Sequence, residues 1–152
     1  MAKLANLAPR GRVHGIDHAS ASVAAARKVN RRLVDGGRVS IQEASVSALP
    51  FVDNTVDLVT AIETHFWWQD LNGGMREAFR VLRPGGRLAV IAEFYNGGRH
   101  AKYADQLAQW TTMTILDVDQ HKTIFADAGF AEVDVDEDEG RGWICALGRK
   151  SR

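Results

Sequence analysis

Asp17 is the residue whose type and position most directly suggest chemistry. It ends an apolar run that starts at Val13, and a helical pattern begins three residues later at Ser20. A carboxylate at the carboxyl end of a strand can accept hydrogen bonds from both hydroxyls of a ribose. The same side chain could instead cap the following helix, although Ser20 and Ser22 could cap it as well. On the residues alone, both roles stay open.

A second segment of interest is the loop Glu43–Phe51, which is rich in small residues. A nucleobase needs a flat apolar slot with a polar contact at its edge, and a loop of small residues beside a strand end can supply both. Serine-rich loops are also common as plain turns. This loop by itself is therefore a weak signal for a nucleotide site.

Aromatic residues follow the apolar run that ends at Ile62. His65 is followed directly by Phe66, Trp67 and Trp68, at the place where the ligand cleft of a parallel sheet should open. Aromatic faces could shelter a sulfonium cation or stack on a substrate. They could also anchor the next helix to the sheet, and we expect one tryptophan in each role.

Short runs of Val, Ile and Leu alternate with helical patterns, and these elements must position the residues above. The alternation predicts an α/β domain whose parallel strands are joined by crossovers, closed by a pair of strands near enough to form a hairpin. The Pro-Gly-Gly turn Arg83–Arg87 reverses the chain between a helix and a strand. The predicted strands are Arg12–Asp17, Arg38–Gln42, Val56–Ile62, Arg87–Ala92, Ala131–Asp136 and Gly142–Leu147. The predicted helices are Ser20–Val34, Leu71–Leu82, Arg99–Leu116 and Val118–Ala128, and Ala2–Ala8 is typical of the tail of another helix.

Length and composition indicate one globular domain over residues 1–152, with 45% hydrophobic and 25% charged residues. Nineteen basic and nineteen acidic side chains cancel and no basic block is visible, so neither nucleic acid nor an anionic membrane is expected as a partner. Because no signal peptide or membrane span is visible, we expect a cytoplasmic protein. The single cysteine, Cys145, lies in an apolar run and is expected to be a buried structural thiol. No metal site is expected.

Taken together, these motifs resemble the class I S-adenosylmethionine-dependent methyltransferases, most of all the small bacterial ones built on one Rossmann-like domain. The resemblance implies a mostly parallel sheet with flanking helices and a C-terminal antiparallel strand pair. It also implies transfer of a methyl group from S-adenosylmethionine to a small-molecule acceptor. The motifs are Val-x-Gly-Ile-Asp ending at Asp17, the loop Leu49–Phe51, Asp-x-Val-x-Ala at Asp57–Ala61, Val-Leu-Arg-Pro-Gly-Gly-Arg-Leu at Val81–Leu88 and Ala-Asp-Ala-Gly-Phe at Ala126–Phe130.

The resemblance places the nucleoside part of the cofactor against four residues. Asp17 matches the family's ribose-binding acid, and His18 lies beside it in the sequence. Ser45 and Val46 match an Asp-Ala pair that contacts adenine, with the acid replaced by serine. That replacement weakens the expected contact with the exocyclic amine of the base.

The methionine part of the cofactor is expected against a second group of residues. Ala61 and Ile62 match the strand end that lies beside it, and Trp67 falls in the aromatic region of the methyl-transfer pocket. The segment Arg99–Leu116 looks like a lid over a small-molecule acceptor. The catalytic residues are not identified, although His65, His100 and Glu93 are candidates for a general base by residue type and expected position.

One departure from the family pattern lies at the start. The family begins with a strand and a Gly-x-Gly-x-Gly loop, and this segment should precede Met1, because Gly11 and Gly15 do not replace it. The absent strand should lie between the strands that end at Asp17 and Ile62, and it would leave two unpaired edges. We therefore expect a homodimer formed through these edges.

Two alternatives to a methyltransferase remain open on the sequence. The first is a non-catalytic pseudo-methyltransferase that serves as a binding or dimerisation module, as the absent glycine loop would favour. The second is a nicotinamide-dependent dehydrogenase, in which an acid after the second strand has the same ribose role. The Pro-Gly-Gly turn and the closing strand pair argue against the dehydrogenase.

Overall fold

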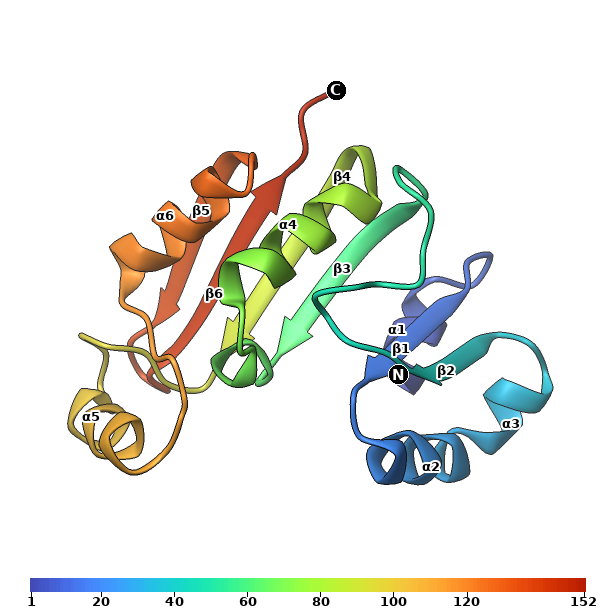
Figure 1. Cartoon of the computed structure of the whole chain (residues 1–152), viewed down its shortest axis with the longest axis horizontal. Coiled ribbons are helices and arrows are strands. Elements are labelled where there is room, and N and C mark those ends of the chain that lie inside the picture. Colours follow the sequence, from blue (N-terminus) through green and yellow to red (C-terminus); the bar gives the residue numbers. More distant parts are fainter. The chain divides into compact units, whose positions relative to one another are not determined.

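The structure is a computed structural model that describes residues 1–152. The chain forms two compact units, Met1–Pro50 and Phe51–Arg152, each with its own sheet (Figure 1). The predicted α/β class is confirmed, because parallel strands, flanking helices and a closing antiparallel strand pair are all present. No helix is long and apolar enough to cross a membrane.

The first unit is built on two parallel strands, β1 (Val13–Asp17) and β2 (Val39–Glu43). Their register pairs Asp17 with Glu43, so the carboxyl ends of both strands lie at the same edge. The helices of this unit are α1 (Ala2–Leu7), α2 (Ser20–Val29) and α3 (Arg31–Asp35). A small core of Ala5, Val23, Val39 and Ile41 joins them to the strands.

The prediction of one helix over Ser20–Val34 was wrong, because the helix breaks at Asn30. The backbone N–H and the side-chain Nδ2 of Asn30 both donate to the carbonyl of Ala26, at 3.0 and 2.8 Å. An asparagine side chain that binds the backbone in this way competes with helix continuation. The chain then restarts as α3.

The second unit is a four-stranded sheet in the order β3-β4-β6-β5. Its strands are β3 (Val56–Ile62), β4 (Leu82–Ala92), β5 (Ala131–Asp138) and β6 (Trp143–Arg149). β3 and β4 are parallel, whereas β6 runs antiparallel to β4 and to β5. Its helices are a 3-10 turn η1 (His65–Trp67), α4 (Leu71–Val81), α5 (Ala101–Trp110) and α6 (Val118–Asp127).

The main core of the second unit lies between its sheet and the helices α4 and α6, which cover one face of the sheet (Figure 1). Met75 and Ala78 from α4, Phe125 from α6 and Val90 from β4 are fully buried there. A second cluster includes Phe66, Ala92, Tyr95 and Ile115. It packs the segments after β3 and β4 against α5 and thereby positions the carboxyl end of the sheet.

Strand β4 begins earlier than predicted, at Leu82 instead of Arg87. The predicted Pro-Gly-Gly turn forms an irregularity within the strand, where the pairing with β3 shifts between Val56 and Leu58. Gly85 has a φ of 82°, which favours glycine. Its N–H donates to the carbonyl of Lys150 at 2.9 Å. This bond joins the turn to the residue that follows β6 and so extends the sheet.

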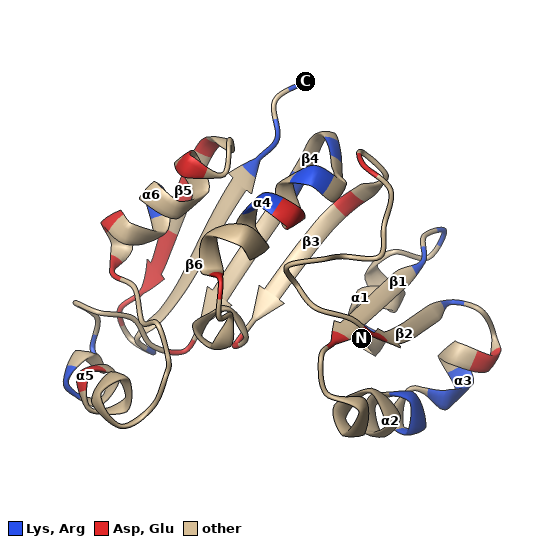
Figure 2. Ribbon diagram, in the orientation of Figure 1, with Lys and Arg blue, Asp and Glu red and all other residues tan.

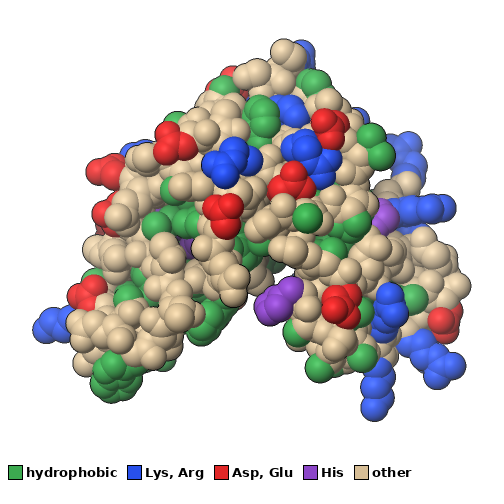
Figure 3. All heavy atoms as spheres, viewed as in Figure 1, with side chains coloured by type: hydrophobic (Ala, Val, Ile, Leu, Met, Phe, Trp, Pro, Cys, Tyr) green, Lys and Arg blue, Asp and Glu red, His purple; other side chains and the backbone are tan.

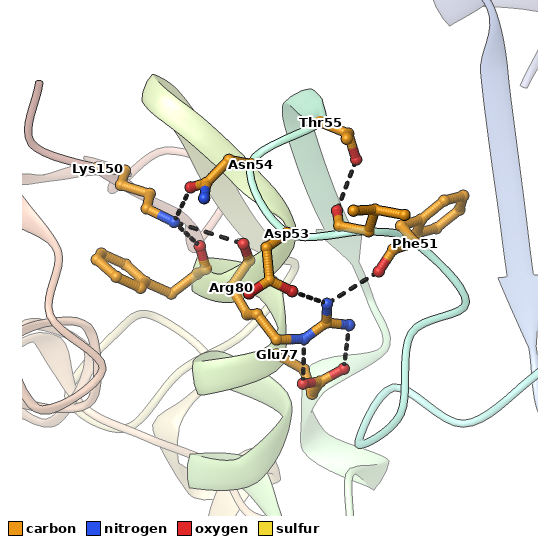
Figure 4. Close-up of polar contacts among 9 residues, drawn as sticks. Phe51, Asp53, Asn54, Thr55, Glu77, Arg80 and Lys150 are labelled. Carbon is orange, nitrogen blue, oxygen red and sulfur yellow. Dashed lines mark hydrogen bonds and ion pairs between the residues drawn. The ribbon is translucent and has the colours of Figure 1, made fainter.

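Arg80 fastens the loop before β3 to helix α4 (Figure 4). Its guanidinium donates to both carboxylate oxygens of Glu77, to Asp53 and to the carbonyl of Phe51. These contacts, led by the bond to Glu77, raise the pKa of Arg80 further above its usual value. The network therefore holds the entry to β3 through charge-assisted hydrogen bonds.

The predicted helix over Arg99–Leu116 is shorter than expected, since α5 ends at Trp110. The hydroxyl of Thr111 accepts from the backbone N–H of Met113 at 3.2 Å and donates to Leu107, an arrangement that competes with further helix. The next helix, α6, starts at a capping box in which Asp117 and Gln120 each bind the other's backbone N–H.

The end strands of the two sheets, β1, β2, β3 and β5, each have one unpaired edge, and two of these edges correspond to the predicted ones. β1 pairs only with β2, and β3 pairs only with β4. No strand of the chain lies beside the second edge of either, as predicted for the strands that end at Asp17 and Ile62.

Candidate functional site

Asp17 lies at the carboxyl end of β1, and its side chain is half exposed. One of its oxygens, Oδ1, accepts a hydrogen bond from the N–H of Ala19 at 2.8 Å and lies 3.8 Å from Nδ1 of His18. Asp17 therefore stabilises the turn into α2, although the N-cap residue of that helix is Ala19. Its second oxygen, Oδ2, has no hydrogen-bond partner in the chain.

The loop that carries Ser45 and Val46 starts beside Asp17. The N–H of Ala44 donates to the carbonyl of Asp17 at 3.0 Å, so β2 and the loop after it are tied to the end of β1. Ser45 is exposed, and its Oγ accepts from the N–H of Ser47 at 3.1 Å. The structure thus brings Asp17, Ser45 and Val46 to one edge of the first unit, and His18 follows Asp17 with an exposed side chain.

Ala61 and Ile62 end strand β3 in the second unit. Ala61 is buried in the main core, whereas Ile62 is 49% exposed. This difference follows from the strand period, because neighbouring side chains point to opposite faces of a sheet. Of these two residues, only Ile62 has a side chain exposed to solvent, and Ala61 has only its backbone to offer a ligand.

The structure separates the two neighbouring tryptophans. Trp68 packs against the main core and serves as an anchor for the start of α4. Trp67 is 54% exposed at the end of η1. Of the pair, Trp67 is the one whose ring is free to meet a ligand.

His65 is fully buried, and neither ring nitrogen has a hydrogen-bond partner. Its ring centroid lies 4.3 Å from that of Phe66 and 5.4 Å from that of His121. Burial, and then the nearby His121, lowers the pKa of His65 to about 3. A buried neutral imidazole cannot reach an acceptor in this structure, so His65 is not placed to act as a general base.

Two carboxylates that end neighbouring strands lie close together. Glu63 follows β3, and its Oε1 accepts from the N–H of Glu93, which follows β4, at 2.5 Å. Glu63 has a φ of 55°, an uncommon conformation for a side chain other than glycine. Burial raises the pKa of Glu63, and the nearby Glu93 adds to this effect although the hydrogen bond opposes it.

Glu63 had not been predicted, although the signal that identified Asp17 applies to it too. Both are acids directly after a predicted strand. Of the other candidate bases, Glu93 is exposed, and His100 is exposed with its Nε2 3.1 Å from the carbonyl of Arg141. His100 therefore serves to hold α5 against the turn between β5 and β6.

Cys145 is partly buried, which is less than predicted. Burial raises the pKa of its thiol, and nearby Asp136 raises it further. Because only a thiolate is an effective nucleophile, these effects favour the predicted unreactive role.

An adenosine ligand fits the acceptors present in the first unit. Ribose recognition needs carboxylate oxygens with unused lone pairs, and Oδ2 of Asp17 offers them. The exposed Ser45 hydroxyl can still donate. Two surface hollows lie elsewhere, one beside α2 and α3 and the other beside Glu132 and the C-terminus.

Comparison with protein families matches residues 1–90 to the model of a methyltransferase domain. Among curated proteins, an O-methyltransferase of Pyrenophora dematioidea is 27% identical over 122 residues, which cover 78% of this chain and 45% of that protein. A ubiquinone/menaquinone biosynthesis C-methyltransferase of Geobacter sulfurreducens is 37% identical over 86 residues, which cover 57% of this chain and 33% of that protein. The chain thus spans less than half the length of these relatives.

Comparison with solved structures finds the same fold. A SAM-dependent methyltransferase of Aquifex aeolicus superposes with a TM-score of 0.78 at 21% identity. The match covers 97% of this chain and 74% of the other. At this identity the likeness shows a shared Rossmann-like methyltransferase fold and leaves the reaction to be argued from the residues.

Proposed function

Because this chain belongs to the methyltransferase domain family, we propose that its protein transfers a methyl group from S-adenosylmethionine to a small-molecule acceptor. S-adenosylmethionine is the family's cofactor, and relatives named as O- and C-methyltransferases support the same reaction class. The family match decides against the nicotinamide-dependent dehydrogenase. The observation that carries the proposal is the free Oδ2 of Asp17 at the end of β1.

We assign the nucleoside to four residues of the first unit. Asp17 accepts hydrogen bonds from the ribose hydroxyls through Oδ2, while Oδ1 remains bonded to Ala19. His18 lies beside the ribose, and Ser45 and Val46 contact the base. Because the bond to Ala19 already orients the carboxylate, little side-chain entropy is lost on binding.

The second unit supplies the contacts to the reacting end. S-adenosylmethionine supplies a methyl carbon on a positively charged sulfur, where an acceptor atom displaces the sulfur. The backbone of Ala61 and the side chain of Ile62 contact the methionine part, and the exposed ring of Trp67 faces the cation. Glu93 takes the proton when the acceptor atom carries one, since its exposed carboxylate is the accessible candidate.

We further propose that both units belong to one Rossmann-like domain over residues 1–152. The strand orders β1-β2 and β3-β4-β6-β5 support this, because each contains an end strand with a free edge. The same two free edges support a homodimer as the form of this chain in solution.

Calorimetric titration of S-adenosylhomocysteine into the full chain tests the cofactor site. We expect binding by the unchanged chain and at least about a tenfold loss of affinity in Asp17→Ala, since a charge-assisted hydrogen bond is worth about 1.5–3 kcal/mol. Asp35→Ala is the matched control, because Asp35 is an exposed acid of the same unit that pairs only with Arg31.

The possible results distinguish the two roles of Asp17, ribose binding and stabilisation of the turn into α2. Equal affinity in Asp17→Ala and the control would mean that Asp17 only stabilises the turn into α2. No heat from the unchanged chain would refute the cofactor site as proposed and would favour the non-catalytic binding module.

A further inference from the structure

Although the chain has no net charge, its two units have opposite formal charges. Met1–Pro50 contains eight Lys and Arg but only three Asp and Glu, a formal charge of +5. Phe51–Arg152 contains eleven basic and sixteen acidic residues, a formal charge of −5. Basic side chains gather around α2 and α3 of the first unit (Figures 2 and 3). The expectation that no anionic partner binds did not consider the charge of each unit separately.

Three of these cations line a surface hollow of about 440 Å³ at the junction of α2 and α3. Lys28 and Arg32 are exposed, and neither forms an ion pair or side-chain hydrogen bond. Arg31 contacts Asp35 at 3.5 Å, and both side chains of that pair are largely exposed. An exposed pair of this kind is weak and exchanges readily for another anion.

The helices account for only part of this arrangement. Lys28 lies in the last turn of α2, where a helix favours a cation, whereas Arg31 and Arg32 follow the break at Asn30 and belong to α3. Arg31 begins the first turn of α3, which contains no acid although a helix favours one there, and Arg32 belongs to the last turn of this short helix. The hollow is therefore lined by three cations, of which only Arg31 has an acidic partner, and an anion fits this arrangement.

The composition of the first unit favours a phosphate backbone over a membrane surface. Helices that lie in a membrane interface use an apolar face with aromatic residues, but residues 1–50 contain no Phe, Trp or Tyr. The apolar side chains Val23 and Ala26 of α2 pack inside the unit, and Val29 alone is strongly exposed beside the hollow. Phe, Trp and Tyr are also the usual stacking platforms for unpaired bases, so their absence favours a duplex over a single strand.

We propose that the surface formed by Lys28, Arg31 and Arg32 binds the phosphate backbone of a nucleic-acid duplex, independently of base sequence. Arginine donates two parallel hydrogen bonds to a phosphate, and lysine adds a point charge. This binding is separate from the cofactor site, because none of the three residues lies at the carboxyl end of β1 or β2.

Fluorescence anisotropy with a labelled RNA duplex of about 16 base pairs, titrated with the full chain at several salt concentrations, tests the proposal. We expect K28E/R31E/R32E to bind at least about tenfold more weakly than the unchanged chain at low salt. Loss of three phosphate contacts should make the slope of log affinity against log salt less negative by about 2.7. The neutral K28Q/R31Q/R32Q variant should show most of the same loss.

The matched control is R76E/K102E/R152E, which changes the net charge equally with three exposed cations of the second unit. We expect it to bind within about threefold of the unchanged chain, because none of these three cations lines the hollow and salt screens charges outside a contact. Equal loss in both charge-reversal variants would overturn the proposal, as would failure of the unchanged chain to bind. Binding to phosphatidylserine vesicles without binding to RNA would also overturn it and would assign the surface to a membrane.

Discussion

Replacement of His65 by leucine tests whether this side chain is held neutral inside the second unit. Leucine has nearly the volume of histidine, so it removes the two buried ring nitrogens, which have no partner, with little change in packing. A buried polar group without a partner costs about 1–3 kcal/mol. At pH 7 we therefore expect His65→Leu to leave the free energy of unfolding unchanged or to increase it by up to about 3 kcal/mol.

The decisive result is the dependence of this difference on pH. An unfolded histidine has a pKa near 6.5, whereas burial lowers the pKa of His65 to about 3 in the folded state. Between pH 6.5 and about pH 3 the unfolded state binds a proton at this histidine and the folded state does not. The free energy of unfolding therefore decreases as the pH is lowered through this range. Between pH 7 and 4.5 the unchanged chain should lose about 2.5 kcal/mol through His65, and His65→Leu should not.

Neighbouring groups also contribute to the total pH dependence, and His121, which lowers the pKa of His65, contributes to this difference as well. The titratable group nearest to His65 is His121, and the titratable group nearest to His121 is Asp117. The backbone carbonyl of Asp117 lies 2.7 Å from Nδ1 of His121. Burial also lowers the pKa of His121, so protonation there would destabilise the fold in the same direction. The raised pKa of Glu63 has the opposite effect on stability. Because the folded state binds the Glu63 proton more readily than the unfolded state does, this group stabilises the fold as the pH falls.

Denaturant unfolding followed by tryptophan fluorescence suits this test, because all four tryptophans lie in the second unit. His100→Leu is the control, since it removes an imidazole that is exposed in the folded state. If the curves of the unchanged chain and His65→Leu ran parallel from pH 7 to 4.5, His65 would be titrating freely in the fold. The argument from burial would then be wrong.

The structure supports two further predictions. A methyl group at Gly148 would overlap the ring of buried Phe125, so Gly148→Ala should reduce the free energy of unfolding by about 1–3 kcal/mol in the same assay. Gly140→Ala should have little effect, since only the side chain of Asp138 is near; equal losses would refute the packing argument. The free edges of β1 and β3 predict a concentration-dependent dimer in sedimentation velocity, and a monomer at all concentrations would contradict this prediction.

Local sequence was sufficient for most elements and for the class of fold. Val56–Ile62 was predicted with its observed bounds, and the closing strands were correctly paired as an antiparallel hairpin. Apolar periodicity and turn residues act over a few neighbouring positions, so they can be read from the chain directly. The same local signals placed Asp17 at the end of a strand, which the structure confirms.

Other features depended on contacts that no local pattern contains. Whether a helix continues through Asn30 depends on where its side chain binds, and the roles of Trp67 and Trp68 depend on which ring meets the core. His65 was a plausible base by its position in the sequence, but its burial comes from packing beside Phe66 and His121.

The distribution of charge also could not be predicted from local sequence patterns. The sequence by itself determined the family, the α/β class and a net charge of zero. Only the tertiary structure divided that charge into units of +5 and −5 and placed Lys28, Arg31 and Arg32 around one hollow. The physical reason is that electrostatic potential depends on distances in space, which composition does not record.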